Sequence, residues 1–203
     1  VVNALSKLLE VWVKRDGQIF YMAFRQGERD SKLKVIGKTE KSETGTTVKF
    51  WPEPKYFDSP KISGKALKHL LQAKAVLCPG LRVRFKDCQT EEENEWYYEG
   101  GLKTYLLEQI THAVTLPPEE PFEGFFEGRE EIAHFAVLWT PENSEVFQES
   151  YVNLVPTKEG GTHVNGLRTG LLEAMREFCE FRNLLPRGIK LAPEDVWDKI
   201  NLH

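Results

Sequence analysis

The first quarter of the chain alternates apolar and polar residues with a period of two, which is typical of half-buried strands. Over residues 8–24 the alternation is interrupted at Asp16-Gly17, a pair typical of two-residue hairpin turns. Residues 32–37 and 44–52 are two further strand-like runs. We therefore expect an antiparallel sheet near the N-terminus.

The pattern then changes to the spacing of a helix. Residues 63–80 place apolar side chains on one helical face, and Pro79-Gly80 ends the run. Residues 81–85 predict another strand, the acidic run 90–95 predicts a solvated hairpin tip, and residues 101–110 predict a short helix.

Residues 115–124, TLPPEEPFEG, contain three prolines and no apolar periodicity, so they predict a boundary between two domains, 1–115 and 116–203. Beyond the boundary, residues 131–139 and 144–156 are strand-like. A long amphipathic helix is expected from residue 163, with Leu167, Leu171, Ala174, Met175 and Phe178 as its apolar stripe. Residues 192–197 predict the start of another helix.

Composition places the chain among ordinary globular proteins. It has 203 residues, 40% of them hydrophobic and 29% charged, with a formal net charge of −4. This charge argues against nucleic-acid binding through overall charge alone but leaves a local basic lining possible. The three widely spaced cysteines indicate reduced thiols in a cytosolic protein. No signal peptide or membrane-spanning run is present, and both ends suggest an internal piece of a longer chain.

Common catalytic motifs are absent: there is no phosphate-binding GxxxxGK[ST] loop, no HExxH and no GxSxG. The stretch TGTTVKF, residues 44–50, has two interpretations. It is either a half-buried strand entered through a glycine, or a ligand wall where Gly45 lets a ring approach, Thr46 makes a polar contact and Val48 gives apolar contact.

Two other stretches also have a structural and a functional interpretation. VKRDG, with Arg15, is either a solvated turn or part of a site. EGGTHVNGLRTG, residues 159–170, is either an ordinary helix start or an anion site, since helix N-termini present free N–H groups and a positive dipole end. Arg168 within it is either a surface residue or a DNA contact.

These stretches occur together, in the same order, in one family. VVNALS, TGTTVKFWP, AKAVLCPG, YVNLVPTKEGGTHVNGLR and AMREFCEFRNLLPRG resemble the B subunits of bacterial type IIA topoisomerases over essentially the whole chain. VVNALS and GGTH are shared with gyrase B subunits, whereas AVLCPG and HVNGLR…AMREFCEFRNLLPRG look more like the topoisomerase IV branch; the gyrase branch stays the alternative.

The resemblance implies an α+β fold: the back portion of a GHKL-type ATPase domain, an α/β sandwich, followed by a transducer domain of ribosomal-protein-like fold. The parent enzyme would use ATP and Mg²⁺ to pass duplex DNA, with the A subunit as partner, self-association of B subunits on ATP binding, and a bacterial cytoplasmic location. The residues that match the family's general base, magnesium ligand and phosphate-contacting lysine would lie outside this chain. We therefore expect no ATP hydrolysis by the chain alone, and a non-enzymatic DNA-clamp domain is the remaining alternative.

The resemblance also assigns individual residues. Thr46 would sit by the adenine, Val48 would form an apolar wall, Arg15 would lie at the pocket rim, and Asn3 would at most stand behind the pocket. Arg168 would face a DNA-sized cavity and contact phosphate. The family signature Gly160, Gly161, Thr162 and His163, which we call the GGTH signature, is expected to be structural, with Thr162 capping the long helix.

Overall fold

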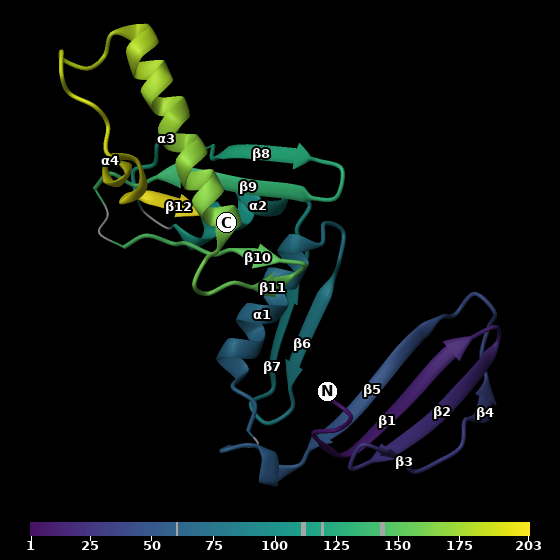
Figure 1. The fold of residues 1–203 in the computed structure, drawn as a ribbon. Helices are drawn as coiled ribbons and strands as arrows, with labels where there is room; N and C mark the ends of the chain where they lie inside the picture. Colours follow the sequence, from purple (N-terminus) through teal and green to yellow (C-terminus); the bar gives the residue numbers. More distant parts are fainter. Residues whose placement is uncertain (60, 111–112, 119, 143–144) are drawn as a thin grey trace. The chain divides into compact units, whose positions relative to one another are not determined.

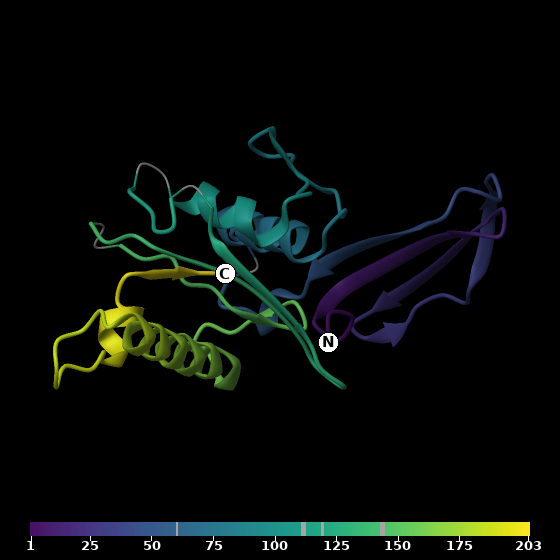
Figure 2. The same cartoon turned by 90° about the horizontal axis from the view of Figure 1, so that it is seen from above.

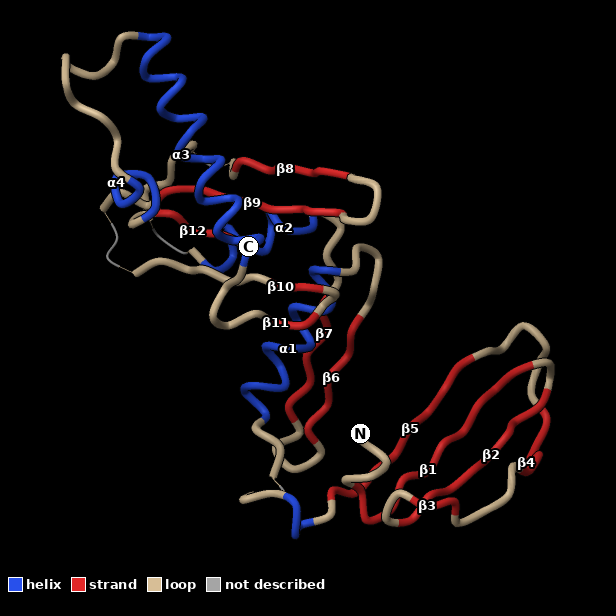
Figure 3. Tube along the Cα trace, viewed as in Figure 1, coloured by secondary structure: helices blue, strands red, loops and turns tan. Residues whose placement is uncertain are grey.

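The computed structural model describes residues 1–59, 61–110, 113–118, 120–142 and 145–203. Residues 119 and 144, which fall inside two of the predicted segments, lie outside this set. The chain has the expected α+β fold and divides into two compact units, Val1–Ser63 and Gly64–His203 (Figures 1 and 3). None of the described helices is both long and apolar enough to cross a membrane.

The first unit is an antiparallel sheet with strand order β3-β2-β1-β5, in which β4 also pairs with β2. Its strands are β1 (Ser6–Arg15), β2 (Gln18–Arg25), β3 (Glu28–Arg29), β4 (Lys34–Lys38) and β5 (Gly45–Pro52), followed by the 3-10 turn Pro54–Tyr56. The predicted hairpin is confirmed: β1 and β2 pair from Leu8–Arg25 to Arg15–Gln18 around Asp16-Gly17. Both turn residues have positive φ, 54° and 76°, as a type I′ turn requires.

The second unit is built around the three-stranded sheet β12-β9-β8, formed by β8 (Phe122–Glu127), β9 (Ile132–Trp139) and β12 (Ile200–Leu202). Helices α1 (Gly64–Leu77) and α2 (Gly101–Gln109) cover one face, and α3 (Thr162–Arg182) covers the other (Figure 2). Successive side chains of β9 point to opposite faces of the sheet, so this strand packs against the helices on both sides. Ala136 and Leu138 are fully buried with α1 and α2, whereas Val137 is buried with β12 and the start of α3.

Helix α3 is confirmed, but only its first half packs as predicted. Val164, Leu167 and Leu171 contact the sheet. Farther along, Ala174 is exposed and Phe178 retains 56% of its accessible surface, because this end of the helix extends past the sheet (Figure 1). The helix ends at Arg182, and the left-handed backbone of the following Asn183 lets Leu184 N–H donate to the Cys179 carbonyl.

The predicted hairpin tip at residues 90–95 is wrong. Strand β7 (Glu92–Trp96) occupies most of this run and pairs with β6 (Val83–Asp87). Two of its glutamates lie opposite basic residues, with Glu95 paired to Arg84 and Glu93 to Lys86. Glu92 lies opposite Asp87 but forms an ion pair with Lys68 of α1, so basic partners support the acidic strand.

Strand β8 was not predicted, because it begins inside the proline-rich segment and its apolar residues are followed closely by charged ones. The expected strand over residues 144–156 is reduced to a small hairpin, β10 (Tyr151–Val152) and β11 (Val155–Pro156). The short helix α4 (Pro193–Trp197) follows α3. The domain boundary near residue 116 stays a prediction; it lies inside the second compact unit, where α2 and β9 share one core.

Candidate functional site

Strands β1 and β5 place the predicted nucleotide residues on one face of the first sheet. Thr46 lies directly opposite Val13, and Val48 lies opposite Val11. Residues at i and i+2 of a strand, and directly opposed residues, share a face, so these four side chains form one patch. The patch is open, since Val48 retains 52% of its accessible surface. A hydroxyl set in an exposed apolar face suits a flat aromatic ligand with a polar edge.

Arg15 lies at the edge of this patch. It is the last residue of β1, two positions after Val13, and therefore falls on the same face. Its side chain is 76% exposed and its Nε lies 3.5 Å from Oδ2 of Asp16. The neighbouring Gly45 has open space where a Cβ would project. The Asp16 contact restrains the Arg15 guanidinium only weakly, because an exposed ion pair of this length contributes little.

Asn3 has a structural contact and one unmatched group. Its Nδ2 donates a hydrogen bond of 3.1 Å to the Gly27 carbonyl, which ties the N-terminal segment to the turn after β2. Its Oδ1 is buried without a hydrogen-bond partner in the described part of the chain. The residue therefore supports the sheet's end and is not part of the open patch.

The GGTH signature forms the entry to α3. Gly160 and Gly161 have φ of 68° and 156°, which side-chain-bearing residues rarely adopt. A Cβ on Gly161 would also lie 3.0 Å from the His163 ring. The predicted capping by Thr162 is wrong: the helix begins at Thr162, Gly161 occupies the N-cap, and no side-chain hydrogen bond caps it. A helical backbone at Thr162 leaves the capping position one residue earlier.

Arg168 lies in the second turn of α3 and contacts α4. Its guanidinium is 3.7 Å from the Glu194 carboxylate and its Cζ is 5.6 Å from the centre of the Trp197 ring. The side chain is 39% exposed. The arginine thus links two helices while keeping part of its charge available to an anion.

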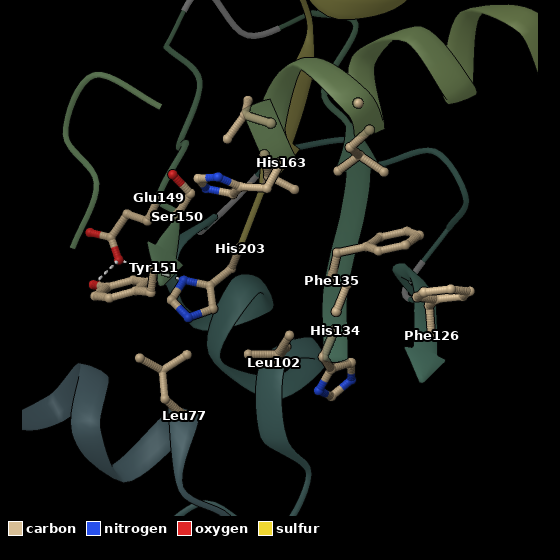
Figure 4. A pocket seen from close by; sticks show the side chains of 15 residues that line it. Leu77, Leu102, Phe126, His134, Phe135, Glu149, Ser150, Tyr151, His163 and His203 are labelled. Carbon is tan, nitrogen blue, oxygen red and sulfur yellow. Dashed lines mark hydrogen bonds and ion pairs between the residues drawn. The ribbon is translucent and has the colours of Figure 1, made fainter. Parts of the chain in front are cut away.

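A cavity of about 330 Å³ lies in the second unit beside the part of β9 that β12 does not reach, and His163 is the member of the predicted set that lines it (Figure 4). Most of its lining is apolar, from residues such as Leu77, Leu102 and Phe135. Pairing between β9 and β12 ends at the backbone hydrogen bonds of Ala136 with His203. The cavity is a mostly apolar gap along the edge of β9, and its lining includes none of the predicted nucleotide residues.

Sequence reasoning missed a buried polar cluster around Glu149, whose side chain is 17% exposed. Oε1 lies 2.7 Å from Nε2 of His69 on α1. Oε2 accepts hydrogen bonds from the hydroxyls of Tyr151 at 3.0 Å and Tyr105 at 3.5 Å, and lies 3.5 Å from Nδ1 of His203. No spacing in the sequence signals this cluster, because its members come from four separate segments.

Burial and partner groups act against each other at this carboxylate. Burial opposes its ionisation, but His203, His69 and the Tyr151 hydroxyl together outweigh burial and hold the pKa of Glu149 below its ordinary value. Burial first, and then the negative charge of Glu149, raise the pKa of Tyr105 and Tyr151 far above that of a free tyrosine. The two hydroxyls therefore remain protonated donors to a charged carboxylate.

Comparisons with known proteins agree on one family. The family model described as DNA gyrase B matches residues 98–202. The B subunit of DNA topoisomerase 4 from Pseudomonas aeruginosa is 61% identical over 200 residues, which cover 98% of this chain and 32% of the relative. The Escherichia coli protein of the same name is 56% identical over 199 residues, covering 98% and 31%. The chain thus spans about a third of these relatives' length.

A solved structure extends the likeness to three dimensions. The topoisomerase IV ATP-binding domain of Francisella tularensis, in complex with a small-molecule inhibitor, superimposes with a TM-score of 0.80 at 38% identity. The match covers 99% of this chain and 54% of that one.

Proposed function

The chain belongs to the DNA gyrase B family, and we propose that it is part of the ATPase and transducer region of a topoisomerase IV B subunit. In this role it helps couple ATP binding and hydrolysis to the passage of one DNA duplex through another. The observation that carries the proposal is the common face of Thr46, Val48 and Arg15, in a chain 61% identical to a protein of that name.

The nucleotide site requires a wall that accepts adenine. In our proposal Val48 and Val11 contact the ring and exclude water from it, the Thr46 hydroxyl makes one hydrogen bond to its polar edge, and Arg15 lies at the rim. Bound ATP supplies the phosphoryl group whose hydrolysis drives the parent enzyme. The residues fit one wall of such a pocket.

Magnesium does not fit these residues. No group of three or more His, Cys, Asp or Glu side chains that could hold a metal occurs in the described part of the chain. Mg²⁺ needs oxygen ligands in near-octahedral geometry. We therefore place its ligands, together with the base for hydrolysis, in other parts of the protein, and we propose that the chain alone does not hydrolyse ATP.

The two predicted domains, 1–115 and 116–203, are proposed as the back of the GHKL ATPase domain and the transducer. The transducer role is supported by Arg168, whose half-exposed guanidinium on α3 can contact duplex phosphates. The proposed partners are the A subunit, duplex DNA and a second B subunit, in the bacterial cytoplasm.

The test uses the full-length B subunit mixed with its A subunit. We expect ATP-dependent decatenation of linked DNA circles and relaxation of supercoils. Thr46→Ala should raise the KM for ATP, whereas Thr47→Ala, which changes a threonine opposite Trp12 on the other face of the same strand, should not. ATP-driven negative supercoiling instead of decatenation would identify the gyrase branch, and ATP-independence would contradict the proposal.

A further inference from the structure

We propose that Glu149 is a positioning residue that forms a breakable polar joint between helix α1 and the segment that leads through β10 and β11 to α3. Resting on the proposed function, the inference deepens it: α1 lies in the part assigned to the ATPase domain, and the segment after residue 148 lies in the part assigned to the transducer. The joint would transmit the nucleotide state from one part to the other.

The contact between the two elements is polar and sparse. Oε1 of Glu149 meets Nε2 of His69 at 2.7 Å, and the Lys74 ammonium donates to the Leu154 carbonyl. Beside these contacts is a cavity of about 550 Å³, lined by both α1 and the segment from Gln148 to Gly160. Phe147 is still packed against the core that contains Ala75 and Val76 of α1, but beyond it the cavity replaces apolar packing, and the two polar contacts connect the segment to the helix.

Glu149 can lose His69 without becoming an unpaired buried charge. Its other oxygen keeps the Tyr151 and Tyr105 hydroxyls, and His203 lies 3.5 Å away. Leaving a buried charge with no partner is strongly destabilising. Because the two hydroxyl donors remain, rupture of the His69 contact costs little, which is the property that a switchable joint needs.

A movement of Glu149 has a continuous route to α3. The neighbouring Ser150 hydroxyl lies 2.6 Å from the Thr157 hydroxyl, which lies 3.4 Å from Nε2 of His163. His163 stands in the first turn of α3, against Gly161. This gives the GGTH signature a role. Gly161 has no side chain and so leaves room for the His163 ring, at which this series of contacts ends.

Several charged or titratable groups surround the joint. The titratable or charged groups around it are His69 and Lys74 on α1, Tyr105 on α2, Tyr151 on β10, His203 after β12, Lys158 before the GGTH signature and His163 on α3.

The first experiment needs no enzymatic activity. Amide hydrogen exchange is measured for residues 151–157 in the full-length protein, at one pH and with correction for the intrinsic rate. Glu149→Gln should speed exchange about fivefold, as expected for a lost half-exposed ion pair. His69→Gln, a change at a half-exposed side chain that spares the core, should do the same. Glu93→Gln breaks an ion pair to Lys86 within the β6–β7 hairpin and should change nothing at residues 151–157.

The second experiment tests transmission. In the complex with the A subunit, Glu149→Gln should lower the number of DNA passages per ATP hydrolysed, while ATP hydrolysis without DNA remains near the wild-type rate. Exchange at residues 151–157 that matches wild type in both variants would overturn the joint. Normal passages per ATP in Glu149→Gln would overturn its role in transmission. A wild-type complex without ATP-dependent passage would refute the proposed function and the transmission, while the exchange data would still decide whether the joint exists.

Discussion

The ring of Phe135 lies across the backbone of Gly124, its direct partner in the β8–β9 pair. A Cβ built on Gly124 would stand 2.2 Å from Cζ of Phe135, far inside van der Waals contact. Glycine is therefore required here because a side chain approaches the backbone closely. The backbone conformation at Gly124 is that of an ordinary strand.

Gly124→Ala should destabilise the protein by about 1–3 kcal/mol, the usual cost of overpacking a site whose neighbours cannot move freely. The measurement is the free energy of unfolding in urea. Gly166→Ala is the matched control, because it adds the same methyl group where no atom lies within 4 Å. Inside α3 this change should stabilise the protein by roughly 0.5–1 kcal/mol. Equal effects of the two substitutions would contradict the packing argument.

Thr46 and Thr47 provide a paired test of the nucleotide face. The full-length protein with Thr46→Ala should bind a non-hydrolysable ATP analogue about 2- to 10-fold more weakly, the range for one neutral hydrogen bond. Thr47→Ala should bind normally, since its side chain points to the opposite face beside Trp12. Isothermal calorimetry measures both, and equal losses would show that the face has been assigned wrongly.

The 203-residue chain by itself should bind that analogue with no measurable heat and no thermal shift in the presence of magnesium. One apolar wall and one hydroxyl bury too little of a nucleotide to offset the cost of association. Calorimetry and a melting curve on this chain check the expectation. Stoichiometric binding would show that the wall around Thr46 and Val48 suffices for affinity.

Local patterns in the sequence predict much of the fold, and interactions between distant segments explain the errors. The Asp16-Gly17 hairpin was predictable because turn chemistry and strand alternation agree within a few residues. The acidic run at residues 90–95 was misinterpreted because its support comes from basic residues on β6, which only the strand register reveals. The exposed end of α3 looks like a core stripe in sequence, because periodicity does not tell how far the sheet extends.

The candidate site likewise has a part that local spacing predicts and a part that only contacts between distant segments reveal. Thr46 and Val48 share a face by their spacing alone, and the resemblance to a known family supplied their role. Glu149 was not predictable, because residues 69, 105 and 203 meet it only in the folded chain.

Arg168→Ala should weaken binding of duplex DNA by the full-length protein and reduce the slope of log affinity against log salt by about 1, as for the loss of one phosphate contact. Fluorescence anisotropy over a salt series measures the slope. Arg129→Ala removes the same charge from the exposed turn after β8 and should leave the slope unchanged. Because Arg168 also contacts Glu194 and Trp197, a melting curve separates lost binding from lost folding. An unchanged slope in Arg168→Ala contradicts a phosphate contact.

The depressed pKa of Glu149 predicts a specific pH dependence of stability. The partners in the folded protein favour the charged carboxylate, whereas the unfolded chain takes up a proton near the ordinary value of 4.5. The unfolded state therefore binds more protons between the folded pKa and that value, so this contribution to stability is present above it and is lost as pH falls through the folded pKa. Glu149→Gln has no such group. The difference in unfolding free energy between wild type and Glu149→Gln, measured in urea from about pH 7 downward, should be constant at first and should shrink below about pH 4.5. A difference that stays constant into the acid range would mean that the carboxylate is not stabilised in its charged form, and that His69 and His203 do not act on it as the distances indicate.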